Sequence, residues 1–224
     1  MLDFEAAIFD LDGTLLDSMG VWHEIDIEFL GRRGIDVPGE YISAVNSKGF
    51  RETAEFTIEY FNLDVTPEEL MDEWFETAVD KYSRKVRLKP SAREYLIFLK
   101  EHGIKLGTAT SLPRMLAEPA LKNNRIYHLF DAFTTTDEAG RSKEYPDVYL
   151  LAAKRLGVPP GNCIVFEDIL PGIKAVRAAG MRPYGVYDKS SEHHRDEIKA
   201  LSEIYIRDFG EILHIHRALC CKDE

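Results

Sequence analysis

The sequence is short of three features: long apolar runs, cysteines and positive charge. No apolar run approaches the roughly 18 residues that a membrane-spanning helix needs, and residues 1–5 lack the basic and then apolar profile of a signal peptide. The three cysteines show no spacing typical of a zinc site or a disulfide framework, and nothing in the sequence assigns a role to the adjacent Cys220 and Cys221. We therefore expect a cytoplasmic protein with no membrane partner.

The charge balance argues against nucleic acid as a partner. The chain has 39 acidic residues against 28 Lys and Arg, a net charge of −11, whereas binding a phosphate backbone needs a basic surface. A small phosphate can still bind a negative protein if positive groups are focused in a cleft. We interpret the one basic cluster as solvated surface or linker: Lys81, Arg84, Lys85, Arg87 and Lys89.

The chain divides into two parts with different sequence patterns. Residues 17–86 show helical patterns only, including a capping box with proline at the first helical position in Thr66-Pro67-Glu68-Glu69 and an apolar helix face that carries Trp22. From residue 87 onward strands alternate with helices, and we expect strands at residues 104–109, 162–166, 181–186 and 204–206. The apolar stretch from Glu5 to Phe9 adds a first strand.

This alternation predicts an α/β fold with a Rossmann-like, doubly wound parallel sheet. Residues 1–16 and 87–224 would form that core domain. Residues 17–86 would form an α-helical cap domain, inserted directly after the first strand. Such an insertion can close over a site and exclude water.

Two carboxylates one residue apart follow the first strand, in Asp10-Leu11-Asp12-Gly13-Thr14. Ligands of open α/β sheets bind just outside the carboxyl ends of the strands. Acidic residues buried there are unfavourable unless they bind a cation or share a proton. The alternative interpretation is an ordinary polar loop after a strand.

Three later segments place polar groups at comparable positions. Thr110-Ser111 ends one strand and offers hydroxyls and backbone amides to a phosphate. Lys143 precedes a helix expected at residues 146–156, where the ammonium and the helix N-terminus can neutralise an anion. Glu167-Asp168 ends another strand, and carboxylates from two strand ends suit Mg²⁺. Taken singly, the three also fit a turn, a surface lysine and a helix cap.

The four segments in this order resemble the haloacid dehalogenase superfamily, in the branch with a helical cap after the first motif. The resemblance implies that Asp10 is a nucleophile that forms an aspartyl-phosphate. It implies that Asp12 is the general acid and then the general base. Mg²⁺ would be held by Asp10, the backbone carbonyl of Asp12 and Asp168, with Glu167 nearby.

The resemblance also implies a set of phosphoryl-binding groups: the side chains of Thr110 and Lys143, and backbone amides near Leu11, Asp12 and Ser111. Phosphoryl transfer depends chiefly on such positioning and on charge neutralisation. Dehalogenases of this family expel a halide and need no acid at the position that Asp12 occupies. The presence of Asp12 therefore favours phosphatase or phosphomutase chemistry.

The function that the resemblance implies is a Mg²⁺-dependent phosphatase of a small phosphorylated metabolite, such as a sugar phosphate. A β-phosphoglucomutase-like phosphomutase stays open as an alternative, in which Lys48 and Arg51 of the cap could hold a second phosphate. A non-catalytic binding protein of the same fold is the third hypothesis. We expect a monomer, and a dimer is compatible with the sequence.

Overall fold

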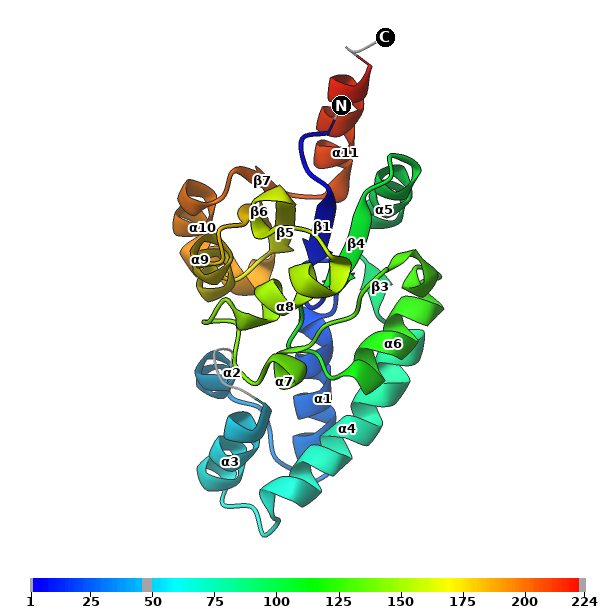
Figure 1. The fold of residues 1–224 in the computed structure, drawn as a ribbon. Coiled ribbons are helices and arrows are strands. Elements are labelled where there is room, and N and C mark those ends of the chain that lie inside the picture. The colour runs from blue at the N-terminus through cyan, green and yellow to red at the C-terminus, as the bar shows by residue number, and fades with distance from the viewer. Residues whose placement is uncertain (1, 46–49, 222–224) are drawn as a thin grey trace. The chain divides into compact units, whose positions relative to one another are not determined.

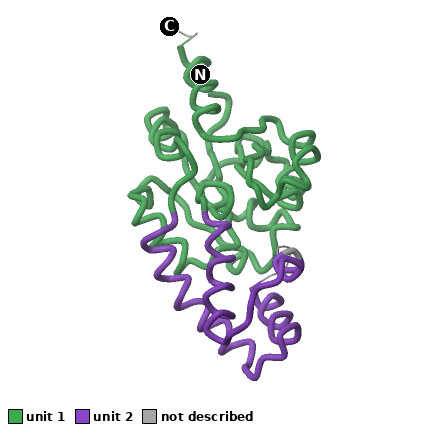
Figure 2. The backbone as a smooth tube through the Cα atoms, turned by 180° about the vertical axis from the view of Figure 1, so that it is seen from behind, with its two compact units in different colours: residues 1–17, 87–224 green, residues 18–86 purple. Residues whose placement is uncertain are grey.

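The computed structural model describes residues 2–45 and 50–221, which form two compact units (Figure 2). Unit 1 comprises residues 1–17 and 87–224, and unit 2 comprises residues 18–86. The first boundary lies one residue from the one expected from the sequence. Lys48 lies outside the described residues. Within the described ranges, no helix is both long enough and apolar enough to cross a membrane.

Unit 1 is built on a five-stranded sheet of order β4-β1-β5-β6-β7 (Figure 1). Its strands are β1 (Ala6–Phe9), β4 (Lys105–Thr108), β5 (Cys163–Glu167), β6 (Arg182–Val186) and β7 (Ile204–Ile206). All neighbouring strands are parallel, which confirms the expected fold class. Because β1 lies between β4 and β5, the carboxyl ends of these three strands are adjacent.

Helices cover both faces of this sheet. Helices α8 (Asp147–Leu156) and α9 (Leu170–Ala178) pack on one face, and α5 (Ala92–Glu101) and α11 (Phe209–Cys220) lie on the other. The remaining helices of unit 1 are α6 (Arg114–Asn123), α7 (Thr136–Ala139), α10 (Arg195–Leu201) and the 3₁₀ segments Tyr127–Leu129, Pro160–Asn162 and Lys189–His194. Sequence patterns had not indicated α5 or α6.

The alternation of side chains along the strands decides what faces each helix layer. Ile8 of β1 and Val165 of β5 belong to the apolar cluster under α8 and α9. Phe9 and Phe166 are register partners whose stacked rings, 4.8 Å apart, point to the opposite layer and meet Phe209 of α11. The next residue of β5, Glu167, therefore turns back toward α8 and α9.

Two short strands carry the chain between the units. Strand β2 (Leu16–Asp17) pairs antiparallel with β3 (Arg87–Leu88), and the Lys89 amide donates to the Leu15 carbonyl at 3.0 Å. The Lys89 ammonium then binds Asp188 Oδ2 at 2.6 Å, with both side chains nearly buried. This pair anchors the returning chain to the loop that follows β6.

The interpretation of the basic cluster as solvated is wrong for two of its members. Lys89 forms the pair just described, and the side chain of Lys81 is 8 % exposed because it binds Glu24 at 3.0 Å and Glu28 at 3.5 Å. Long aliphatic stems allow lysine to pack along apolar surface while its charge finds a partner. The other three residues are exposed as expected: Arg84, Lys85 and Arg87.

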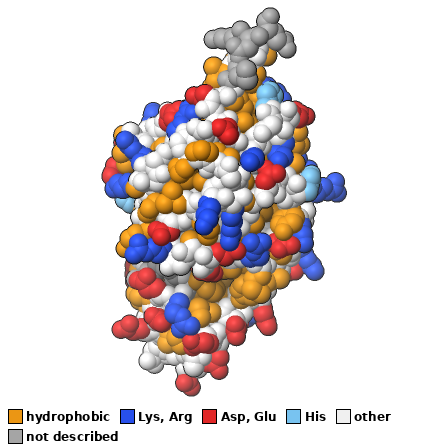
Figure 3. Space-filling model, in the orientation of Figure 1, with side chains coloured by type: hydrophobic (Ala, Val, Ile, Leu, Met, Phe, Trp, Pro, Cys, Tyr) orange, Lys and Arg blue, Asp and Glu red, His pale blue; other side chains and the backbone are white. Residues whose placement is uncertain are grey.

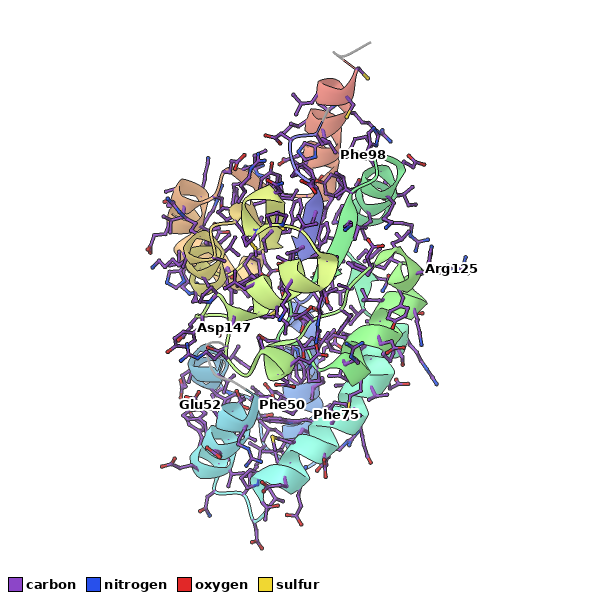
Figure 4. The ribbon with its side chains drawn as sticks, in the orientation of Figure 1. Phe50, Glu52, Phe75, Phe98, Arg125 and Asp147 are labelled. Atoms are coloured by element: carbon purple, nitrogen blue, oxygen red, sulfur yellow. The ribbon has the colours of Figure 1, made fainter. Side chains whose placement is uncertain are left out.

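Unit 2 consists of helices α1 (Met19–Gly31), α2 (Gly39–Val45), α3 (Phe50–Phe61) and α4 (Pro67–Arg84). The capping box at Thr66 is confirmed, since its side chain accepts from the Glu69 amide at 3.2 Å and Glu69 accepts from the Thr66 amide at 2.8 Å. The ring of Trp22 contacts Tyr82 and Phe50, a residue labelled in Figure 4. Trp22 is therefore a half-buried residue that packs against the aromatic side chains of unit 2.

Stability should depend on the protonation of one buried histidine. His216 of α11 is 2 % exposed, its ring packs against Phe4 and Tyr184, and its Nδ1 lies 3.1 Å from the Tyr95 hydroxyl. Burial lowers the pKa of His216 to about 4. In the unfolded chain this histidine takes up its proton near pH 6.5, so its contribution to stability is complete above pH 6.5 and is lost as the pH falls toward 4.

The substitution His216→Gln keeps a hydrogen-bonding side chain that does not titrate. Between pH 6.5 and 4.5, the free energy of unfolding of the variant should fall by about 2 kcal/mol less than that of the parent protein. Urea denaturation of both proteins at a series of pH values measures this difference. The same pH dependence in both proteins would contradict the assignment.

Candidate active site

The carboxyl ends of β1, β4 and β5 bring the predicted polar residues of unit 1 to one edge of the sheet. Asp10 directly follows β1, and its amide donates to the Phe166 carbonyl of β5 at 3.0 Å. Glu167 is the last residue of β5, and Asp168 follows it. Asp10, Glu167 and Asp168 are buried, and each offers a carboxylate oxygen within 4.8 Å of the others.

Lys143 supplies positive charge to this cluster. It lies before α8, whose first residue, Asp147, is labelled in Figure 4. Its ammonium forms ion pairs with Asp10 Oδ1 and, at 2.7 Å, with Glu167 Oε2. A lysine that is only 6 % exposed is thus fixed between carboxylates from two neighbouring strands.

Tyr149 is a member of the cluster that the sequence analysis missed. Its buried hydroxyl donates to Glu167 Oε2 at 2.9 Å. Leu151 of α8 is only half-buried, whereas the buried residues of this helix are Val148, Tyr149, Ala152, Ala153 and Leu156. The spacing i, i+3, i+4, i+7 from Tyr149 was the available signal for its burial.

The loop after Asp10 is shaped around Asp168. Thr14 donates its hydroxyl to Asp168 Oδ1 at 2.8 Å, a contact that also was not expected. Gly13 has φ +80°, and a Cβ atom there would lie 2.5 Å from Asp168 Oδ2. The Leu11 carbonyl accepts the amides of Thr14 and Leu15, which closes the loop tightly.

The electrostatics of the cluster show a deficit of positive charge. Burial, followed by repulsion between the acidic groups, raises the pKa of Asp168 and of Glu167, although Lys143 opposes the shift at both. Burial lowers the pKa of Lys143, but attraction to Asp10 and Glu167 outweighs burial and keeps that pKa above its usual value. Three carboxylates that face a single ammonium suit a divalent cation, and their all-oxygen donor set fits a hard ion such as Mg²⁺.

The other predicted residues of unit 1 lie around the same strand ends. Thr110 follows β4 and is buried, and its Oγ1 accepts the Leu112 amide at 3.0 Å, which leaves the hydroxyl proton available to an anion. Ser111 is exposed, and Asp12 is partly exposed in the loop after β1. The predicted phosphate contacts of Thr110, Ser111 and the amides of Leu11 and Asp12 stay predictions.

Arg51 lies in unit 2, on α3. It binds Glu68 of α4 at 2.8 Å and Glu55, one turn further along α3, at 4.0 Å. All three side chains are more than half exposed, so these pairs are weak. The expected contact of Arg51 with a second phosphate stays a prediction.

Comparison with known proteins agrees with this arrangement. A family model described as haloacid dehalogenase-like hydrolase matches residues 4–180. The chain is 32 % identical over 179 residues to fructose-1-phosphate phosphatase YqaB of Escherichia coli, which spans 80 % of this chain and 94 % of that protein. It is 30 % identical over 200 residues to a phosphorylated carbohydrates phosphatase of Thermotoga maritima. That match covers 89 % of this chain and 90 % of the Thermotoga protein.

A solved structure extends the similarity to the whole fold. The crystal structure of a putative β-phosphoglucomutase from Thermotoga maritima superimposes with a TM-score of 0.80 at 27 % identity. The match covers 96 % of this chain and 99 % of that one.

The contact between Gly13 and Asp168 predicts that no larger residue fits at position 13. Gly13→Ala combines an unfavourable positive φ with a methyl group 2.5 Å from Asp168 Oδ2, so it should destabilise the fold and displace that carboxylate. Gly103→Ala is a matched control, because Gly103 has φ +76° and no atom within 4 Å of its virtual Cβ.

Urea denaturation should show that Gly13→Ala lowers the free energy of unfolding by at least about 1 kcal/mol more than Gly103→Ala does. Equal losses in the two variants would mean that Asp168 does not depend on the space at Gly13.

Proposed function

The chain belongs to the haloacid dehalogenase-like hydrolases, and we propose that it is a Mg²⁺-dependent phosphatase of small phosphomonoesters, with phosphorylated sugars as its substrate class. The observation that carries the proposal is the buried Asp10 carboxylate, paired with Lys143 at the edge of the sheet and followed two residues later by Asp12. This combination supplies a nucleophile, a positive charge for the phosphoryl group and an acid for the leaving oxygen.

The reaction would proceed in two displacements at phosphorus. An oxygen of Asp10 attacks the phosphorus, the ester P–O bond breaks, and Asp12 gives its proton to the departing alkoxide. Asp12 then removes a proton from water, which attacks the aspartyl-phosphate and releases inorganic phosphate and the free Asp10 carboxylate. Asp12 is only partly buried, so water can reach it for this second role.

The remaining groups bind and orient the substrate. Lys143 and the Thr110 hydroxyl would hold phosphoryl oxygens, together with Ser111 and the amides of Leu11 and Asp12. Asp10, Asp168 and the Asp12 carbonyl would hold the metal ion, which when bound neutralises charge shared by the carboxylates and the phosphoryl group. Unit 2 would act as a cap that excludes water and contacts the rest of the substrate.

The proposed substrate class is supported by the relatives and by charge. Two of the relatives carry names that specify fructose 1-phosphate and phosphorylated carbohydrates. Figure 3 shows Lys and Arg side chains interspersed with acidic ones over the face that it displays, with no broad basic area. A net charge of −11 likewise disfavours a polyanionic substrate and is compatible with a small phosphoester bound inside the site.

The proposal predicts metal-dependent release of phosphate that requires Asp10. A panel of sugar phosphates, nucleotides and other small phosphoesters should yield inorganic phosphate with Mg²⁺ and none with EDTA. Asp10→Asn should lower kcat for the best substrate by roughly 10⁴-fold or more while circular dichroism shows an intact fold. Asp196→Asn on α10 is the matched control at an exposed position and should leave kcat unchanged.

Two results would refute the proposal. Turnover by Asp10→Asn at the parental rate would exclude Asp10 as the nucleophile. Conversion of β-glucose 1-phosphate to glucose 6-phosphate that depends on a bisphosphate primer, without net phosphate release, would identify a phosphomutase instead.

A further inference from the structure

Both carboxylate oxygens of Glu167 accept hydrogen bonds from other groups of the protein. Oε2 accepts from the Lys143 ammonium at 2.7 Å and from the Tyr149 hydroxyl at 2.9 Å. Oε1 accepts the amides of Asp168 at 3.2 Å and Ile169 at 3.3 Å. A carboxylate has about four lone-pair sites, so these four donors account for its capacity. Glu167 therefore acts as a fixed counter-charge within the protein.

Tyr149 reaches this carboxylate because of where α8 begins. Lys143 lies four residues before the first residue of α8, and Tyr149 is the third residue of that helix, so one short segment delivers both donors to Glu167 Oε2. Tyr149 is fully buried. A buried hydroxyl bonded to a carboxylate contributes more than a neutral hydrogen bond, and its loss leaves the charge under-solvated.

Gly172 provides the space in which this contact forms. A Cβ atom at position 172 would lie 2.6 Å from Glu167 Cδ and 2.8 Å from the Tyr149 hydroxyl. The backbone of Gly172 is not in the positive-φ region, so the requirement for glycine is steric alone. Helix α8, strand β5 and helix α9 therefore pack closely around the hydrogen bond between Tyr149 and Glu167.

We propose that Tyr149 is a positioning residue of the site, whose hydroxyl holds Glu167 in place so that Glu167 fixes the Lys143 ammonium where a phosphoryl group binds. Lys143 Nζ is shared between Asp10 Oδ1 and Glu167 Oε2. Without the hydroxyl, Glu167 Oε2 keeps only the Lys143 ammonium as a donor and its charge is less neutralised, so it draws Lys143 away from Asp10. This inference rests on the proposed role of Lys143 in binding phosphate.

A double-mutant cycle tests whether Tyr149 acts through Lys143. Tyr149→Phe removes the hydroxyl and keeps the ring in the core. It should lower kcat/KM about 10- to 100-fold, by analogy with the loss found when a hydrogen-bond partner of a metal ligand is removed. In a Lys143→Met background the same substitution should have no further effect, because the residue that it positions is absent. A purely structural role would lower kcat/KM equally in both backgrounds and would overturn the inference.

Tyr145→Phe is the matched control on the same segment. Tyr145 is exposed and its ring stacks under Arg141, away from the hydrogen bonds of Glu167. This variant should keep the parental kcat/KM. A loss as large as that of Tyr149→Phe would also overturn the inference, because it would show no special role for the buried hydroxyl.

All four proteins of the double-mutant cycle should also be titrated with inorganic phosphate in a calorimeter. This measurement separates the positioning role of Tyr149 from the proposed function. Tyr149→Phe should weaken phosphate binding about 10-fold or more in the parent and not in the Lys143→Met background. If this pattern appears but no phosphoester is hydrolysed, the proposed function fails and the positioning role stands. If the parent protein binds no phosphate, Lys143 holds no phosphoryl group and the positioning role fails.

Discussion

The buried ion pairs of Lys143 are the interaction on which the arrangement of the site depends. One ammonium contacts Asp10 and Glu167, which follow or end neighbouring strands, and Asp168 lies within the same cluster. Removing three carboxylates and an ammonium from water is costly, and the cost is offset only by the close contact of opposite charges and by hydrogen bonds to the carboxylates. The deficit of positive charge that remains could be neutralised by a divalent cation at the proposed site.

The sheet order makes this clustering possible. With β1 between β4 and β5, the loops that follow the three strands meet at one edge, although they are about 100 and 60 residues apart in the chain. The stacked pair of Phe9 and Phe166 fixes β1 against β5 one residue below the acidic groups. Close packing at Gly13 and Gly172 then limits where Asp168 and Glu167 can lie. Glu167 is thus held on strand β5 itself, and Asp10 and Asp168 each directly follow a strand.

The polar residues that occur in recognisable motifs could be predicted from the sequence, and those that act through packing could not. Asp10, Lys143 and the pair Glu167-Asp168 follow apolar strands or precede a helix, so their approximate positions were accessible from pattern alone. The role of Tyr149 depends on the rotation of α8 against β5, which a one-dimensional pattern does not define. The burial of Lys89 likewise depends on Asp188, about 100 residues further along the chain. Sequence patterns indicate the strand and the polar residue, whereas partners far apart in the chain require the folded structure.

In the proposed reaction, Asp10 receives the phosphoryl group, and Asp12 first protonates the leaving oxygen and then activates water. The most direct measurement uses Asp12→Asn with p-nitrophenyl phosphate, whose leaving group departs without a proton. Phosphorylation of Asp10 should then remain fast while hydrolysis is slow, so a rapid-mixing experiment should show a burst of one equivalent of nitrophenolate. Mass spectrometry of the acid-quenched protein should place one hydroxylamine-sensitive phosphoryl group on the peptide that contains Asp10. Steady release of nitrophenolate at the parental rate, with no burst and no labelled peptide, would contradict the account.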